Sequence, residues 1–322
     1  MISEIFPGFY HLDLPYPRHP LHNINIYLVR GSARSLLIDT GVDIEECRET
    51  LTGYLKELGV KLGKTDFFIT HGHRDHFGLL PGLATETSVV YVTRNDATLM
   101  KDGNLMWERR LAAASSHGFP GEVIEDALRS PPYNPSLNNH LRFRYLKQDD
   151  TLSIGKFKFL CLETPGHSKG HLCLYEPKNK FILTGDHVLF NVSPNVSCWS
   201  MDENPLADYL NSLDKVYKLD VELALPGHRK IMKDLKGRVR ELKEHHEKRA
   251  SEALSILEQG PMNAYAIASA MTWDIPCDTW EEVPTWQKFS AVGETISHLN
   301  YLEARGEVKH ETSGGEIVYS LK

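Results

Sequence analysis

Three histidines and an aspartate stand within six residues, in the segment His71-Gly72-His73-Arg74-Asp75-His76. The apolar run that precedes them, DFFIT from Asp66 to Thr70, predicts a buried strand that leads straight into the histidines. Imidazoles and carboxylates are the ligands that borderline divalent metals favour, and an irregular loop lets neighbouring side chains converge on one ion. The segment therefore predicts a metal-binding loop at the carboxyl end of a strand.

Three further signals share the same setting, a strand end followed by glycine. They are Pro165-Gly166-His167, Thr184-Gly185-Asp186-His187 and Pro226-Gly227-His228. Any one of these histidines alone would be read as a turn or core residue, but four strand-end clusters together predict one convergent site. For His171 and His187 we expect supporting or structural roles, with substrate contact or protonation of a leaving group as the alternative.

The segments between these clusters alternate between short strands and helices. Apolar runs predict strands at 25–29, 35–38, 66–70, 87–92 and 221–225, and a second set of strands at 141–146, 151–154, 157–163, 171–175 and 181–184. The region from about 95 to 140 interrupts this rhythm with two helical patterns. We expect this insertion and the loop 190–203 to flank the metals, in an α/β fold that carries its ligands at one edge.

Composition narrows the class of protein. A chain of 322 residues allows one large domain or two ordinary ones, and its net charge of −7 does not favour binding to phosphate backbones or anionic lipid. The first residues do not resemble a secretory signal, and no apolar stretch approaches the roughly 20 residues of a membrane-spanning helix. The five cysteines are scattered and form no C-x-x-C motif. These features predict a cytoplasmic protein with reduced thiols and no membrane association.

The order HxHxDH, then His, Asp and His, resembles the metallo-beta-lactamase superfamily of hydrolases. The resemblance covers about residues 8 to 232 and includes Leu37-Ile38-Asp39-Thr40-Gly41, which is similar to the family's first strand pair and its supporting aspartate. The tail from about 235 to 322 resembles a winged-helix extension found in the branch related to beta-lactamase-like ribonucleases and glyoxalase-II-type thioesterases. The resemblance implies an αββα sandwich over residues 1–232, with a helical insertion at about 95–140, and a small winged-helix-like domain over 233–322.

The resemblance also implies a site for two divalent metal ions. His71, His73 and His167 would hold one ion, Asp75, His76 and His228 would hold the second, and Asp186 would bridge them. Zinc is the expected metal, while iron or manganese also suits these nitrogen and oxygen donors. Two such ions lower the pKa of a bridging water to about 7, which supplies a metal-bridging hydroxide for attack on a carbonyl. Asp75 and Asp186 are then the catalytic residues, and Asp39 supports a ligand.

The expected substrate is a small-molecule ester or thioester with an apolar acyl or ring group. Two interpretations are open for the apolar residues of the insertion: they line a pocket for that group, or they form the insertion's own small core. These residues are Met100, Met106, Trp107, Phe119 and Tyr133.

Two other functions compete with ester hydrolysis, a beta-lactamase-like endoribonuclease and a non-catalytic ligand-binding sensor. Residues 238–322 hold nine Lys and Arg against fourteen Asp and Glu, whereas phosphate binding needs several cations on one face. We therefore expect no nucleic-acid partner and interpret the tail as a packing or homodimerisation module. A sensor would not need to keep all seven ligand positions intact.

Overall fold

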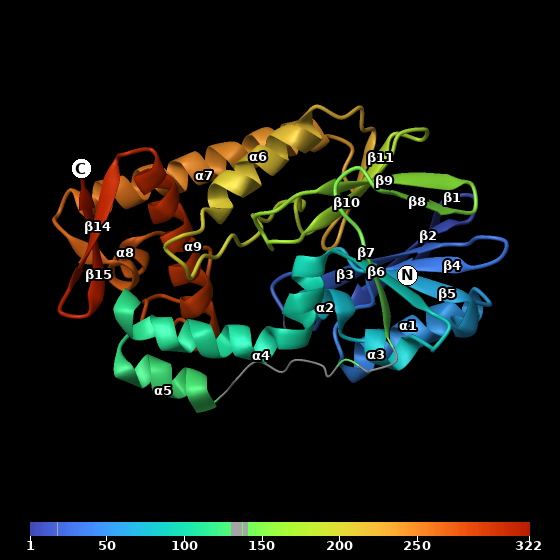
Figure 1. The fold of residues 1–322 in the computed structure, drawn as a ribbon, viewed down its shortest axis with the longest axis horizontal. Helices are drawn as coiled ribbons and strands as arrows, with labels where there is room; N and C mark the ends of the chain where they lie inside the picture. Colours follow the sequence, from blue (N-terminus) through green and yellow to red (C-terminus); the bar gives the residue numbers. More distant parts are fainter. Residues whose placement is uncertain (18, 130–136, 138–140) are drawn as a thin grey trace. The chain divides into compact units, whose positions relative to one another are not determined.

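The computed structural model describes residues 1–17, 19–129, 137 and 141–322. Contacts divide the chain into two compact units, whose elements are labelled in Figure 1. The first unit consists of Met1–Gly103, Asn134–Pro194 and Ser212–Val239, and the second of Asn104–Tyr133, Asn195–Asn211 and Arg240–Lys322.

The first unit is built on two sheets. The seven-stranded sheet, ordered β1-β2-β3-β4-β5-β6-β7, consists of β1 (Ile2–Phe6), β2 (Phe9–Pro15), β3 (Asn23–Val29), β4 (Ser35–Ile38), β5 (Thr65–Phe68), β6 (Val89–Val92) and β7 (Arg142–Tyr145). The five-stranded sheet, ordered β12-β11-β10-β9-β8, consists of β8 (Thr151–Ile154), β9 (Phe157–Glu163), β10 (Leu172–Glu176), β11 (Phe181–Gly185) and β12 (Leu223–Pro226). Strands β4 to β7 run parallel, as do β11 and β12.

The inner strands of the larger sheet are buried on both faces, and the alternation of side chains along them explains how. On β5, Phe67 joins the apolar cluster under the helices, and its neighbour Phe68 joins the cluster shared with the second sheet. Leu37 and Ile38 on β4 divide in the same way. Successive residues of a strand point to opposite faces, so a continuous apolar run such as DFFIT fits a strand covered on both sides.

Short helices cover the outer face of the larger sheet. They are α1 (Glu45–Glu57), η1 (Leu62–Lys64), α2 (Arg74–Phe77) and α3 (Leu80–Leu83). Three other helices have residues in both compact units: α4 (Arg94–Ala114), α6 (Pro205–Tyr217) and α7 (Leu235–Leu257). At the second sheet, Ser212 of α6 donates a hydrogen bond to the carbonyl of Pro165 at 2.9 Å. The predicted αββα architecture is confirmed.

The place of one predicted strand is different. Residues 141–146 were expected to open the second set of strands, but β7 pairs in parallel with β6 in the first sheet, with Val89 opposite Arg142. An apolar and aromatic run indicates a strand without naming its partner. The chain therefore enters the second sheet only at β8.

The second unit contains helices and a three-stranded sheet. Its elements beyond the shared helices are η2 (Ser115–His117), α5 (Gly121–Arg129), β13 (Met262–Asn263), α8 (Ala264–Ala270), α9 (Thr285–Ala304), β14 (Val308–Ser313) and β15 (Glu316–Leu321). The sheet order is β13-β15-β14. Helices α8 and α9 precede the β14–β15 hairpin in the predicted order, and likeness to a winged helix stays a prediction. Within the described part of the chain, no helix is both long and apolar enough to span a bilayer.

The aromatic residues of the insertion form core. Phe119 is 5% exposed, and its ring lies 4.5 Å from that of Phe289 on α9, while the Trp107 ring lies 5.0 Å from Phe289. Met100 is buried in the core of the first unit, and Met106 is exposed. The interpretation as an apolar substrate pocket is therefore wrong for the buried residues, because their side chains are used in packing.

Two expectations are not tested by the structure. Tyr133, the remaining apolar residue named in the insertion, lies outside the described residues. The division into domains 1–232 and 233–322 also stays a prediction, although contacts assign Asn104–Tyr133 of the insertion to the second compact unit.

We predict that Phe119→Ala destabilises the second unit by about 3–5 kcal/mol, because it leaves a cavity among aromatic rings. Thermal unfolding measures the effect, and Leu105→Ala, at a position 44% exposed, is the control. Equal melting temperatures for both variants would show that Phe119 does not contribute to the core.

Glu294 makes the stability of the second unit depend on pH. Burial raises the pKa of this α9 carboxyl to about 7, against the opposing charge of Arg249 and a hydrogen bond from Asn195 at 3.0 Å. Because the folded pKa exceeds the ordinary value of 4.5, the stabilisation is present below pH 4.5 and is lost as pH rises through about 7.

We therefore predict that Glu294→Gln raises the melting temperature at pH 8 and hardly changes it at pH 5. The amide has no charge to bury, so the difference at pH 8 should be roughly 1–3 kcal/mol. Unfolding curves measured across this pH range test the prediction, and parallel wild-type and variant curves would contradict it.

Candidate metal centre

Four chain segments carry the predicted ligands to the same place. The loop after β5 brings His71 and its neighbours, the loop after β9 brings His167, β11 leads into Asp186, and β12 leads into His228. All four are carboxyl ends of strands, and two sheets contribute. The structure thus places the seven predicted residues together, and their role as ligands stays a prediction.

One group of donors consists of three imidazoles. His71 Nε2 lies 3.0 Å from His73 Nδ1 and 3.2 Å from His167 Nε2. The potential ligand atoms of these residues all lie within 4.8 Å of one another. His71 is buried, whereas His73 and His167 are partly exposed.

The second group combines Asp75, His76 and His228, whose donor atoms also lie within 4.8 Å of one another. His228 Nε2 is 3.3 Å from Asp75 Oδ2. Asp186 connects the two groups: Oδ1 lies 3.5 Å from His76 Nε2, and Oδ2 lies 3.4 Å from His228 Nε2 and 3.8 Å from His167 Nε2. A carboxylate placed between two sets of imidazoles has the position of a bridging ligand.

Buried polar atoms at this place fit metal ions. His76 Nε2, His228 Nε2 and Asp186 Oδ1 are inaccessible to solvent and have no hydrogen-bond partner among the described residues. Such atoms are costly to bury unless something satisfies them. Gly227 keeps the space around them open, since a Cβ there would lie 2.5 Å from Asp186 Oδ1 and 2.8 Å from His76 Cε1.

The electrostatic environment differs between the two groups of donors. Burial lowers the pKa of His71 well below its ordinary value and that of His73 to about 3, so both rings are neutral and keep a lone pair for a cation. Burial alone would also lower the pKa of His228, but the carboxylates of Asp186 and Asp75 outweigh it and raise this pKa to about 9. The second group thus lies in a strongly negative field that a cation would neutralise.

Hydrogen bonds fix the orientation of three of these rings. His76 Nδ1 bonds Asp39 Oδ2 at 2.7 Å, and His228 Nδ1 donates to the carbonyl of Asn23 at 2.7 Å. His71 Nδ1 bonds the hydroxyl of Thr70 at 3.1 Å. Each bond engages Nδ1 and leaves Nε2 facing the centre, an arrangement typical of metal-binding histidines.

Asp39 has the supporting position that the family resemblance implies. Its backbone takes a left-handed conformation at φ 60°, and its carboxylate also accepts hydrogen bonds from the backbone N–H and the hydroxyl of Thr70, both at 2.8 Å. Asp39 therefore ties His76 to Thr70, directly before the predicted metal-binding loop.

His171 supports the predicted bridging residue. Its Nε2 accepts a hydrogen bond from the backbone N–H of Asp186 at 3.1 Å, and its Nδ1 bonds the hydroxyl of Thr164 at 2.8 Å. Gly185 permits this approach, because a Cβ there would lie 2.7 Å from His171 Nε2. The supporting role expected of His171 agrees with these contacts, and His187 is fully buried nearby.

Asp96 is a residue that the sequence analysis missed. It is 1% exposed, and its Oδ2 accepts hydrogen bonds from the backbone N–H of Gly72 at 3.0 Å and from the hydroxyl of Ser168 at 2.6 Å. Its Oδ1 accepts from the N–H of Gly170 at 3.0 Å. Asp96 therefore joins the His71 loop to the His167 loop. In the sequence it is only an acidic residue in the first turn of a helix, a common feature without functional meaning.

Two more residues near the centre were missed, both in the segment between β2 and β3. The rings of Tyr16 and His19 stack with centroids 4.1 Å apart, and the Tyr16 ring lies 6.2 Å from that of His228. Burial and the charge of Asp75 raise the pKa of the Tyr16 phenol, so this residue keeps its proton. A tyrosine beside a proline-rich start carries no motif that could have indicated this position.

Comparisons with known proteins agree with this geometry. A sequence profile of the metallo-beta-lactamase superfamily matches residues 19–228. The chain is 26% identical over 308 residues to the probable metallo-hydrolase YqjP of Bacillus subtilis, covering 92% of this chain and 93% of that protein. It is 30% identical over 221 residues to the acyl-coenzyme A thioesterase MBLAC2 of Gallus gallus, covering 63% and 72% respectively.

A solved structure is similar along the whole chain. A metallo-beta-lactamase family protein of Thermus thermophilus has a TM-score of 0.81 and 29% identity, covering 99% of this chain and all of that one. The chain belongs to the metallo-beta-lactamase superfamily. It carries a cluster of histidines and aspartates that is capable of binding metal ions.

We predict that Asp96→Asn weakens metal binding by about 10–100-fold, as loss of support for ligands commonly does. The Asp96 carboxylate now accepts three hydrogen bonds, from Gly72, Ser168 and Gly170. The amide of asparagine would turn an NH₂ group toward one of these donors, which breaks that hydrogen bond and loosens both loops. Competition with a chromophoric chelator measures the affinity, and Asp102→Asn, an exposed aspartate of the same helix, is the control. Equal affinities in the two variants would show that Asp96 has no positioning role.

Proposed function

We propose that this protein is a metal-dependent hydrolase that cleaves a carbonyl ester or thioester of a small molecule. The observation that carries the proposal is the convergence of five imidazoles and two carboxylates, with Asp186 between the two groups of donors. Membership of the superfamily supports hydrolysis as the reaction class.

The predicted metal ligands fall into two groups according to their positions. His71, His73 and His167 would hold one ion, and Asp75, His76 and His228 the other, with Asp186 shared. Two divalent ions, when bound, supply hydroxide at neutral pH and polarise the carbonyl of the substrate. Zinc is the expected metal, and iron or manganese suits the same donors.

Asp75 has the access that a catalytic carboxylate needs. Its side chain is 17% exposed, whereas that of Asp186 is 6% exposed. Asp75 therefore reaches the side of the centre that is open to a substrate, where it can accept a hydrogen bond from the attacking water and orient it. Asp186 is held from behind by His171 and is suited to fixing the two groups of donors relative to each other.

Support for an ester or thioester bond comes from the chemistry and from one relative. The centre needs no serine or cysteine nucleophile, since it acts on an electrophilic carbon by direct attack of water. The similar protein from Gallus gallus is named as an acyl-coenzyme A thioesterase. A thioester is therefore the first substrate class to assay.

We predict that Asp186→Ala lowers metal occupancy and reduces kcat by orders of magnitude, because the variant loses the shared ligand. Elemental analysis of the purified protein and hydrolysis assays on thioesters, esters, lactones, phosphodiesters and RNA measure both effects. Asp220→Ala removes an exposed carboxylate and is the control.

Two results would contradict the proposal. The first is unchanged turnover by a metal-free Asp186→Ala preparation. The second is cleavage of RNA or phosphodiesters without any hydrolysis of esters or thioesters, which would place the ribonuclease alternative first.

A further inference from the structure

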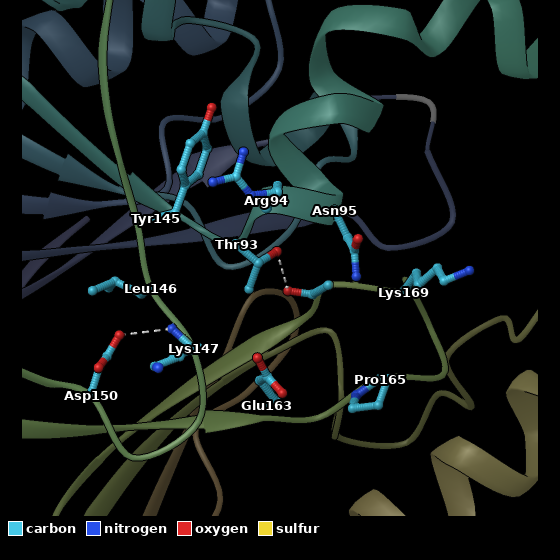
Figure 2. A pocket seen from close by; sticks show the side chains of 11 residues that line it. Thr93, Arg94, Asn95, Tyr145, Leu146, Lys147, Asp150, Glu163, Pro165 and Lys169 are labelled. Atoms are coloured by element: carbon cyan, nitrogen blue, oxygen red, sulfur yellow. Dashed lines mark hydrogen bonds between the residues drawn. The ribbon is translucent and has the colours of Figure 1, made fainter.

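A pocket of about 350 Å³ lies in the first unit, beside the loop that carries His167. It is formed where β6, β7 and β9 end, and Figure 2 shows its lining. We call it the polar pocket; its lining residues are Thr93, Arg94, Asn95, Tyr145, Leu146, Lys147, Asp150, Glu163, Pro165, Lys169 and Gly170. A volume of this size holds a ligand of nucleotide dimensions.

The lining decides which part of a substrate fits. Tyr145, Leu146 and Pro165 are the apolar side chains of the lining, and the other side chains are polar or charged. An acyl chain matches such a lining poorly, because its burial would strip water from charged groups. The pocket is therefore suited to the polar part of a substrate.

Cations from three separate segments line this pocket. Arg94 begins α4, Lys147 follows β7, and Lys169 lies two residues after His167. These three cations outnumber the two carboxylates of the pocket, in a chain whose net charge is −7. Arginine and lysine placed around one cavity favour phosphate or carboxylate groups.

An aromatic ring lies at the same end of the pocket as Arg94. The guanidinium carbon of Arg94 is 4.4 Å from the centroid of the Tyr145 ring, which is 39% exposed. Figure 2 shows the two side chains facing each other. A stacked guanidinium and phenol offer a flat surface on which a planar base can lie.

The two carboxylates of the pocket lie apart from this end. Figure 2 shows Asp150 and Glu163 on the side opposite Arg94 and Asn95. Asp150 accepts a hydrogen bond from the backbone N–H of Lys147 at 3.0 Å. Carboxylates accept hydrogen bonds only, so this side suits hydroxyl and amide N–H groups of a ligand, while phosphates belong at the cationic side.

The pocket and the candidate metal centre share the loop that carries His167. Pro165 and Lys169 belong to the His167 loop, and the hydroxyl of Thr93 donates to the carbonyl of Gly170 at 2.8 Å. A ligand held here therefore lies against the loop that carries one of the predicted metal ligands.

We propose that the polar pocket binds the nucleotide portion of a thioester's leaving group, that is, a thiol of the coenzyme A class. This inference rests on the proposed thioester hydrolysis and adds the part of the substrate that is recognised. Phosphates meet Arg94 and Lys169, the base lies on the stacked pair of Arg94 and Tyr145, and hydroxyl and amide groups meet Asp150 and Glu163.

Binding is tested without turnover, using desulfo-coenzyme A, which has no sulfur to contact a metal. Isothermal titration of the zinc-loaded full chain compares the wild type with the double variant Arg94→Gln/Lys169→Gln. We expect the Kd of the double variant to rise at least about tenfold, as loss of charge-assisted hydrogen bonds predicts. Added salt should weaken binding to the wild type.

A matched control removes two cations elsewhere in the first unit. The control variant is Lys158→Gln/Lys178→Gln, which changes two exposed lysines. At the pocket, the end of β9 pairs with the start of β10 through Glu163 and Leu172. Lys158 and Lys178 lie near the other ends of these two strands, away from the pocket. The control should keep wild-type affinity. Arg94→Lys/Lys169→Arg should keep most of it, which separates the loss of charge from a disturbed fold.

Kinetics distinguish failure of this inference from failure of the proposed function. An acyl-coenzyme A and the N-acetylcysteamine thioester of the same acyl group share the scissile bond and differ in the nucleotide. Arg94→Gln/Lys169→Gln should lower the preference for the coenzyme A substrate, measured as a ratio of kcat/KM values, at least about tenfold.

Each outcome has one meaning. Hydrolysis of both thioesters by the wild type without preference, or equal binding of desulfo-coenzyme A by all variants, overturns the inference and leaves the proposed function intact. Binding that depends on Arg94 and Lys169 in a protein that hydrolyses no thioester overturns the proposed function. Wild-type protein that does not bind desulfo-coenzyme A at millimolar concentration also overturns the inference.

Discussion

The structure depends on keeping polar side chains together where water does not reach them. His71, His76 and His228 are fully buried, and their Nε2 atoms face one another and Asp186. In the absence of a shared cation such an arrangement is unfavourable, because lone pairs and charges meet without compensation. The fold holds these side chains in place in two ways. Hydrogen bonds at Nδ1 orient the three rings, and the Asp96 carboxylate joins the His71 loop to the His167 loop.

The sequence was sufficient to predict that these side chains converge, because each cluster lies at the end of a strand and contains a glycine. This local pattern indicates both the type of side chain and its position at the end of a strand. Predicting that HGHRDH and the three later clusters converge therefore required no tertiary information. Asp96 could not be found in this way, since its role depends on two loops that are 96 residues apart at His71 and His167. The same reason explains β7. Its sequence indicates a strand, and only the folded sheet shows that its partner is β6.

Aromatic residues in the insertion illustrate a second limit. Trp107 and Phe119 suit a substrate pocket and a core equally well, because both need large apolar surfaces. Phe289 on α9, which packs against both rings, decides for the core, and it lies 170 residues after Phe119 in the chain. The pocket that the structure does contain is lined by charges instead. Recognition in this protein is thus argued from polar groups near the ligand loops rather than from apolar residues of the insertion.

The predicted ligands are unequally buried, which has a consequence for how metal ions would enter and leave the site. His73, Asp75 and His167 are partly exposed, whereas the other four predicted ligands are buried. An ion must therefore arrive and leave through the side where these three residues lie, and each of the two donor groups has at least one member on that side. Neither of the two predicted metal positions is sealed behind the other. Metal ions that bind at these predicted positions would then need no fixed order of loading, and they could enter from solution without unfolding the strands at whose carboxyl ends the positions lie.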